Sequence, residues 1–191
     1  MELEVKEAVK KYDQNKRYTY ADYAGWDDDE RYELIDGEVY AMSAPSTAHQ
    51  SICMELSRQF ANFLVGKQCK VFASPFDICL NGKGDEDDTV VQPDIIIICD
   101  ESKLDKKRLN GAPDLAIEIL SPSTASRDRI VKLNRYLKAG VREYWIVDPE
   151  IEGITVNTLE NGKYVVSAFE SSETIPVSIL EGCNISLPDV F

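Results

Sequence analysis

The stretch APDLAIEILSPSTASRDRIVKL, residues 112–133, places a charged residue inside an apolar run. Glu118 lies in the middle of the segment from Leu115 to Leu120, whose composition predicts a buried β-strand. A carboxylate is costly to desolvate unless it is paired or holds a metal ion. Glu118 is therefore either a structural exception or a residue that the strand delivers to a site.

A second acid is expected close to Glu118. The segment VVQPDIIIICD, residues 90–100, predicts another strand buried on both faces, and Asp94 opens its apolar part directly after Pro93. Two carboxylates on neighbouring central strands repel each other unless a cation lies between them. Magnesium prefers carboxylate oxygens and typically keeps several waters. Asp94 and Glu118 are thus candidate metal ligands, and the alternative is that both lie at strand ends in contact with solvent.

Strand alternation assigns faces to the residues around Glu118. Asp114, Ala116, Glu118 and Leu120 should share one face of the predicted strand 113–121. The segment 125–140 predicts a helix that stops at Gly140. At about 100° per residue, its apolar residues predict a buried face, which places Lys132 on the flank. The residues of that buried face are Ile130, Leu133 and Leu137, and those that share the flank with Lys132 are Arg129 and Tyr136.

The hairpin 31–42 has Asp36-Gly37 at its turn, which is a strong signal for a two-residue connection. In that register Glu33 faces Tyr40 and Ile35 faces Glu38. These four residues share one face, which is either a solvent face or a source of carboxylates for a site. The other face of the hairpin looks like core and consists of Tyr32, Leu34, Val39 and Ala41.

His49 points inward near the start of a helix predicted over 46–66, which is capped by Ser46 or Thr47. It is either a packed residue or a member of a site. The remaining predicted elements are a short helix in 18–26, a loop over 27–30, strands over 70–80 and 141–149, a loop over 81–88, a hairpin over 154–169 with Asn161-Gly162 at its turn, and a tail with one more short strand. We expect an arm or helix over 1–17 and a single domain over 18–191.

The composition excludes several classes of protein. Only one histidine is present, so a His-rich metal site is excluded, and no apolar run approaches the roughly 20 residues that span a bilayer. The five cysteines include no CxxC pair and predict reduced, mostly buried thiols of a cytoplasmic protein. A net charge of −13 opposes non-specific attraction to nucleic acid, although it allows a local basic groove.

The sequence resembles a known nuclease family. QPDI followed by IEIL is similar to the PD-(D/E)XK nuclease signature, and three longer segments resemble the putative restriction endonuclease family of bacterial proteins in that superfamily. Those segments are YELIDGEVYAMSAPSTAHQ, QPDIIII and PDLAIEILSPSTASRDRIVKLNRYLKAGVREYWIVDPE, and the likeness spans roughly residues 20–170. The fold that it implies is an α/β (α+β), restriction endonuclease-like mixed central sheet flanked by helices, with extra N- and C-terminal hairpins.

The resemblance also implies a site. Asp94 and Glu118 would bind Mg²⁺ or Mn²⁺, and Glu33 or Glu38 would supply a further acid. This sequence departs from the superfamily pattern at Leu120, because the superfamily has a lysine at that position. Lys132, on the following helix, is the nearest candidate to replace it, and a surface lysine is the alternative. Arg127 and Arg129 are candidate phosphate contacts, with a solvated position as the alternative for each.

The expected function is a metal-dependent endonuclease acting on DNA. The alternatives are a catalytically silent binding or regulatory module with the nuclease fold, favoured by the net charge, or a phosphodiesterase acting on RNA or another phosphoester. A homodimer is compatible with the expected function, since cutting both strands usually requires two sites.

Overall fold

The computed structural model describes residues 12–13, 15–27 and 30–191. Most of the arm or helix predicted over 1–17 and part of the loop predicted over 27–30 therefore lie outside the described residues. The first described helix, α1 (Tyr20–Tyr23), falls within the predicted segment 18–26.

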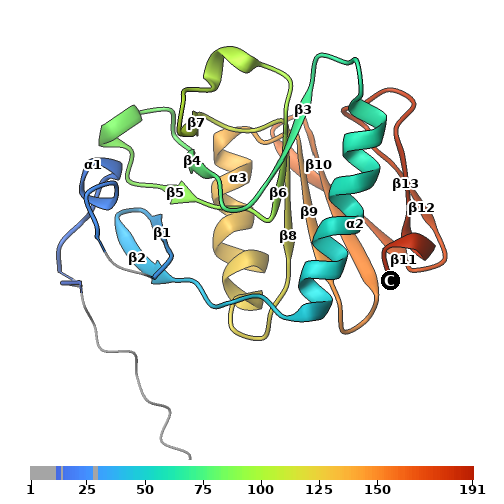
Figure 1. The fold of residues 1–191 in the computed structure, drawn as a ribbon, viewed down its shortest axis with the longest axis horizontal. Coiled ribbons are helices and arrows are strands. Elements are labelled where there is room, and N and C mark those ends of the chain that lie inside the picture. Colours follow the sequence, from blue (N-terminus) through green and yellow to red (C-terminus); the bar gives the residue numbers. More distant parts are fainter. Residues whose placement is uncertain (1–11, 14, 28–29) are drawn as a thin grey trace, which may run out of the picture.

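A mixed six-stranded sheet forms the core of the fold (Figure 1). Its strand order is β11-β10-β9-β8-β6-β3, in which β8 and β9 are parallel and the other neighbours are antiparallel. A parallel pair needs a crossover connection, and here the helical segment between β8 and β9 provides it. The strands are β3 (Lys70–Ala73), β6 (Ile95–Ile98), β8 (Leu115–Ile119), β9 (Glu143–Asp148), β10 (Gly153–Glu160) and β11 (Lys163–Glu170).

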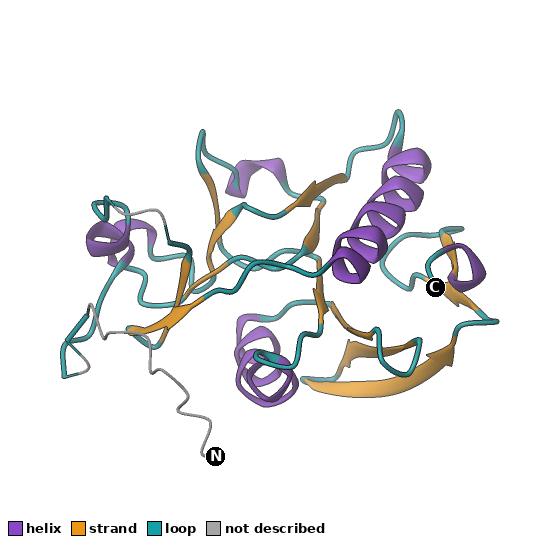
Figure 2. Cartoon of the chain, turned by 60° about the horizontal axis from the view of Figure 1, so that its bottom comes forward, coloured by secondary structure: helices purple, strands orange, loops and turns teal. Residues whose placement is uncertain are grey.

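Helices α2 (Thr47–Leu64) and α3 (Leu133–Ala139) cover opposite faces of this sheet (Figure 2). Helix α2 begins after Ser46, whose side chain accepts a hydrogen bond from the His49 backbone N–H at 3.2 Å, as the capping pattern predicted. Leu56 and Phe60 on α2 pack in one apolar cluster with Ile117 and Trp145 of the sheet.

A second sheet packs beside the first and has the order β2-β1-β5-β4-β7. Its strands are β1 (Tyr32–Ile35), β2 (Glu38–Ala41), β4 (Asp77–Cys79), β5 (Val90–Val91) and β7 (Arg108–Asn110). The prediction of single strands over 70–80 and 90–100 is therefore wrong, because each segment divides between the two sheets. The divisions fall at Pro75 and Pro93, which have no N–H to donate to a strand ladder.

The register of the hairpin 31–42 is confirmed, with Glu33 opposite Tyr40 and Ile35 opposite Glu38. The assignment of its faces is wrong in part. All of β1 is buried, including Glu33, whereas Glu38 and Ala41 of β2 are exposed. The reason is position in the sheet, since β1 lies between β2 and β5, and β2 is an edge strand.

The hairpin predicted over 154–169 is confirmed as β10 and β11, with Asn161 and Gly162 at positive φ in the turn. The tail forms a small sheet of two strands, β12 (Thr174–Pro176) and β13 (Asn184–Ser186), where one strand was predicted. The loop over 81–88 contains a 3₁₀ turn, and its Asp87 is fully buried rather than solvated.

The face assignment of β8 is confirmed. Leu115, Ile117 and Ile119 pack in the cluster beneath α2, whereas Ala116 and Leu120 pack in the cluster that contains Tyr136 of α3. Glu118 alternates with the first group, so its side chain lies on the α3 side of the central sheet.

The helix predicted over 125–140 exists, but its predicted buried face is wrong. It consists of a π-helical turn (Arg127–Lys132) followed by α3, and it ends at Gly140 with φ 83°. Ile130 is 60% exposed, whereas Asp128, Lys132 and Tyr136, which follow each other at intervals of four residues, are buried. The rule of apolar burial gave the wrong face because the buried residues of this helix include Lys132, which pairs with Glu33 and Glu118, whereas Leu133 is only partly buried against the apolar cluster.

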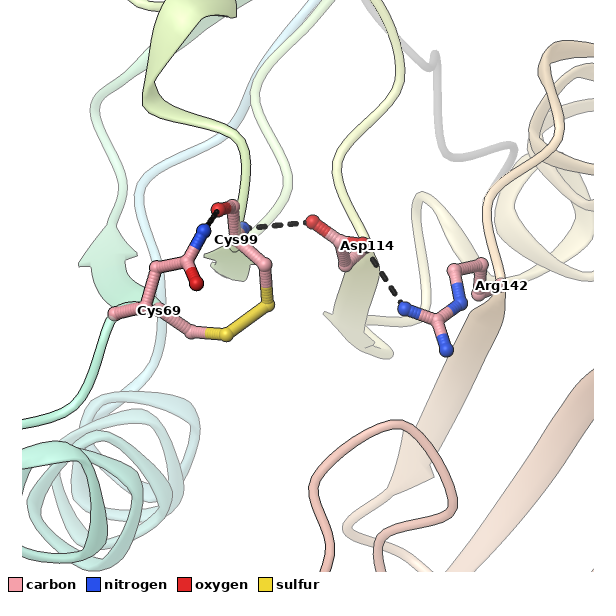
Figure 3. The surroundings of a disulfide bond; sticks show 5 residues. Cys69, Cys99, Asp114 and Arg142 are labelled. Atoms are coloured by element: carbon pink, nitrogen blue, oxygen red, sulfur yellow. Dashed lines mark hydrogen bonds and ion pairs between the residues drawn. A yellow bond between two sulfur atoms is a disulfide. The ribbon is translucent and has the colours of Figure 1, made fainter.

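The prediction of five reduced cysteines is also wrong. Cys69 and Cys99 form a disulfide that joins the ends of the adjacent strands β3 and β6 (Figure 3). The Cys99 backbone N–H donates to Asp114 at 2.7 Å, and Arg142 in turn donates to the other carboxylate oxygen of Asp114 at 3.3 Å. Strand pairing, which spacing along the chain does not reveal, brings the two cysteines together.

In the part of the chain that the structure describes, no helix has both the length and the apolar character to cross a membrane.

The disulfide predicts a thiol count and a change in stability. Denatured, unreduced protein should give three reactive thiols, those of Cys53, Cys79 and Cys183, and reduced protein should give five. Reduction should lower the free energy of unfolding by about 3 kcal/mol, because the bridge restricts the unfolded chain. Thiol titration and urea unfolding measure the two effects, with the Cys69→Ser/Cys99→Ser double variant as the control that should not respond to reductant. Five thiols before reduction would contradict the bridge.

Candidate active site

A cavity of about 200 Å³ lies where β1, β6, β8, the start of α2 and the π-helical turn meet. Six of the residues singled out from the sequence line it: Glu33, His49, Asp94, Glu118, Arg127 and Lys132. Two others lie elsewhere. Glu38 is exposed and pairs with Arg17 at 2.5 Å, and Arg129 is 45% exposed and pairs with Asp148 at 2.6 Å.

Lys132 lies at the centre of a buried cluster of carboxylates. Its Nζ is 2.8 Å from Glu33 Oε1, 2.9 Å from Glu118 Oε1 and 3.5 Å from Asp128 Oδ1. Burial alone would lower the pKa of Lys132, but the charges of Glu118, Glu33 and Asp128 raise it above its usual value. Lys132 therefore carries a fixed positive charge, and it comes from the helix that follows β8 rather than from β8 itself.

Glu118 is only 4% exposed, and two donors bind one of its oxygens. Oε1 accepts from Lys132 Nζ and, at 2.7 Å, from the hydroxyl of Tyr136. Burial raises the pKa of Glu118 well above its usual range, Lys132 opposes this shift, and the charges of Asp128, Glu33 and Asp94 add to it. The protein therefore offsets only part of the free-energy cost of burying the ionised form of Glu118.

Two groups fix the side chain of Asp94, which directly precedes the inner strand β6 of the central sheet. Its Oδ2 accepts from the Ile119 backbone N–H at 2.8 Å and lies 3.2 Å from His49 Nε2. Burial lowers the pKa of His49, but its interactions with Asp94 outweigh burial and raise it overall. The single histidine therefore contacts Asp94 directly, from the first turn of α2.

Glu33 is fully buried and links the second sheet to the cluster. Its Oε1 also accepts from the Gln92 backbone N–H at 2.9 Å, and its Oε2 lies 4.0 Å from Arg127. Burial alone would raise the pKa of Glu33, but Lys132, the Gln92 N–H and Arg127 together hold it below its usual value. The ionised form of Glu33 is therefore stabilised by folding.

Sequence reasoning missed four residues of this site: Arg31, Gln92, Asp128 and Tyr136. One signal could have found two of them. The predicted helix carries polar side chains at every fourth residue, namely Asp128, Lys132 and Tyr136. Residues at this spacing share one face of a helix, so the sequence indicated a polar face that could pack against the buried Glu118. Nothing in the local pattern marks Arg31 or Gln92.

A model of the family described as "Putative restriction endonuclease", Uma2, matches residues 19–188. The chain belongs to this family. Among the relatives of this restriction endonuclease family member are two uncharacterised Synechocystis proteins. One is 27% identical over 158 residues, which cover 81% of each chain, and the other is 27% identical over 122 residues, which cover 62% of this chain and 67% of the relative.

A solved structure shares the fold of this family member. It is a crystal structure described as a putative nuclease from Anabaena variabilis, with a TM-score of 0.72 and 21% sequence identity. The match covers 91% of this chain and 97% of the other. The expected mixed sheet flanked by helices, with hairpins near both ends, is thereby confirmed.

The metal ion that the fold family implies fits the residues present. In the described part of the chain no group of three or more His, Cys, Asp or Glu side chains is arranged to hold a metal ion. Magnesium, however, commonly uses one or two carboxylates and keeps its waters, and Asp94 and Glu118 line one cavity. Buried carboxylate oxygens without hydrogen-bond partners, Glu33 Oε2 and Asp128 Oδ1, add negative potential there. The donor set suits a hard divalent cation.

The opposite pKa shifts of Glu118 and Glu33 predict opposite effects on stability. Glu118 has a raised folded-state pKa, so its ionisation costs stability as the pH rises above its usual 4.5. Glu118→Gln should therefore raise the unfolding temperature of the metal-free protein at pH 7, with no gain near pH 4. Glu33 has a folded-state pKa below its usual 4.5, so its ionised form stabilises the folded protein above pH 4.5. This contribution is lost as the pH falls through the folded-state pKa of Glu33.

Glu33→Gln should accordingly lower stability at pH 7, by about 2 kcal/mol, because it removes a charged acceptor from buried Lys132. The measurement is thermal unfolding in EDTA between pH 4 and pH 8. Glu38→Gln is the matched control, since Glu38 is exposed and outside the cluster. If Glu118→Gln destabilised the protein more than Glu33→Gln at pH 7, the assigned shifts would be wrong.

Proposed function

We propose that the chain is a metal-dependent endonuclease that hydrolyses phosphodiester bonds of DNA through a variant PD-(D/E)XK site. The family description and the description of the Anabaena structure both name a nuclease, which supports the reaction class. The observation that carries the proposal is the 2.9 Å contact between Lys132 and Glu118, in the same cavity as Asp94. Lys132 thus supplies, from the following helix, the cation that Leu120 cannot provide.

Asp94 and Glu118 would hold Mg²⁺ or Mn²⁺. When bound, such an ion lowers the pKa of a coordinated water and stabilises negative charge on a phosphate. Asp94 is suited to this role because the Ile119 N–H and His49 fix one of its oxygens. Glu118 is suited because Lys132 and Tyr136 both bind Oε1.

Lys132 acts as a fixed charge in this proposal. Three carboxylates raise its pKa, so it stays protonated and does not serve as a general base. A buried ammonium beside the reacting phosphate offsets the charge that develops in the transition state, and its fixed position costs no reorganisation. Glu33 and Asp128 hold it in place.

His49 positions Asp94, and Arg127 contacts the phosphate backbone. His49 Nε2 lies 3.2 Å from Asp94 Oδ2. Arg127 lines the cavity, is 15% exposed and lies against the ring of Tyr40, with its charge near the cluster. Arg129 would have to leave Asp148 to contact DNA, so it contributes less. The net charge of −13 confines attraction for DNA to such local cations.

This proposal predicts divalent-dependent cleavage that the carboxylates control. The wild-type chain should cut supercoiled plasmid in Mg²⁺ or Mn²⁺ and not in EDTA. Asp94→Asn and Glu118→Gln should each lower the cleavage rate about 100-fold or more, because each removes a metal-binding charge. Gel assays of plasmid relaxation measure the rate, and calorimetry should show weakened Mn²⁺ binding in the same two variants.

Glu38→Gln is the matched control for this experiment, since it makes the same chemical change on the exposed strand β2. It should cleave at the wild-type rate. Equal cleavage by all of these variants would mean that the activity comes from a contaminant or another site. A parallel assay on RNA of the same sequence separates a DNA endonuclease from an enzyme that acts on RNA.

A further inference from the structure

Arg31 differs from the other arginines of the chain. It directly precedes β1 and lines the cavity. Among the described residues it is the one arginine without a carboxylate in ion-pair contact. The arginines that do contact a carboxylate are Arg17, Arg58, Arg108, Arg127, Arg129, Arg135 and Arg142. Within the part of the chain that the structure describes, no carboxylate therefore pairs directly with Arg31.

A neutral amide fixes the guanidinium of Arg31. Gln92 Oε1 accepts from Arg31 Nε at 3.2 Å and from one terminal nitrogen at 2.6 Å. Guanidinium carries five N–H donors, so about three remain for another acceptor. An amide orients the planar group without neutralising it, which leaves an oriented cation at the cavity wall.

Hydrogen bonds of both its side chain and its backbone fix Gln92 in place. Its Nε2 donates to the Tyr23 hydroxyl at 2.8 Å and to Asp77 Oδ1 at 2.7 Å. Its backbone N–H donates to Glu33 Oε1, the same oxygen that binds Lys132. One residue therefore fixes the position of Arg31 relative to the Glu33–Lys132 pair.

We propose that Arg31 binds a phosphate group of the nucleic-acid strand next to the scissile bond, and that Gln92 is the positioning residue for Arg31. A planar fork of N–H donors matches phosphate oxygens, and an arginine free of carboxylates loses no ion pair when it binds them. This inference rests on the proposed nuclease function, because it assigns the ligand of that same cavity.

The test measures DNA binding apart from cleavage. All variants are made in the Glu118→Gln background and studied in EDTA, with a fluorescein-labelled 12-nucleotide single-stranded DNA as the probe and fluorescence anisotropy as the readout. Arg31→Gln should weaken binding about tenfold or more and reduce the salt dependence of binding by about one phosphate contact. Arg31→Lys, which keeps the charge but loses the fork, should fall between Arg31→Gln and the parent.

Arg58→Gln is the matched control, since it removes the same charge from an exposed ion pair on α2. It should bind as the parent does. Gln92→Leu should weaken binding as much as Arg31→Lys, and adding it to Arg31→Gln should have no further effect, since the two residues act as one unit. Unfolding temperatures of all variants verify that they fold.

The outcomes separate the two proposals. Loss of binding in Arg31→Gln supports the assignment even if the wild-type chain never cleaves DNA. Equal binding by Arg31→Gln and Arg58→Gln, or no binding by the parent, overturns it. If the wild-type chain cleaves and Arg31→Gln in the wild-type background cleaves with the same KM, the nuclease proposal stands and the role of Arg31 fails.

Discussion

The ammonium of Lys132 holds together carboxylates from three separate parts of the chain. Glu33 comes from the second sheet, Glu118 from the centre of the first, and Asp128 from the π-helical turn between β8 and β9. Without that cation the three buried acids would repel one another at a large cost in free energy. The ion cluster therefore joins the two sheets and the crossover helix at one point, and the cavity forms beside it.

Other contacts of the site fix a carboxylate or a cation in one orientation. Tyr136 and Lys132 bind one oxygen of Glu118, His49 and the Ile119 N–H bind one oxygen of Asp94, and Gln92 holds both Glu33 and Arg31. Such prior orientation is what electrostatic catalysis on a phosphate requires. The same arrangement leaves the ionised form of Glu118 only partly compensated, which is consistent with the divalent cation that we propose for this site.

Local patterns predicted the elements that carry the carboxylates but not every partner of those carboxylates. Alternation in 113–121 placed Glu118 on the correct face, and the Asp36-Gly37 turn gave the correct register for Glu33. The helix 125–140 was assigned the wrong face, since the rule of apolar burial fails where a helix buries ions. The two prolines that divide 70–80 and 90–100 between sheets were visible, yet nothing local indicated a second sheet.

The sequence by itself was enough to place the chain in its family and to predict a mixed sheet between helices, because motif residues spread along the chain carry that resemblance. It also predicted the candidate pair Asp94 and Glu118, because each acid lies in or beside an apolar strand segment. Tertiary structure alone decided which of Glu33 and Glu38 enters the cavity, that Lys132 reaches Glu118, that Cys69 meets Cys99, and that Gln92 holds Arg31 at the cavity wall. The physical reason is the same in each case. These contacts join residues far apart in the chain, and their energies depend on burial and on charges that only the folded arrangement brings together.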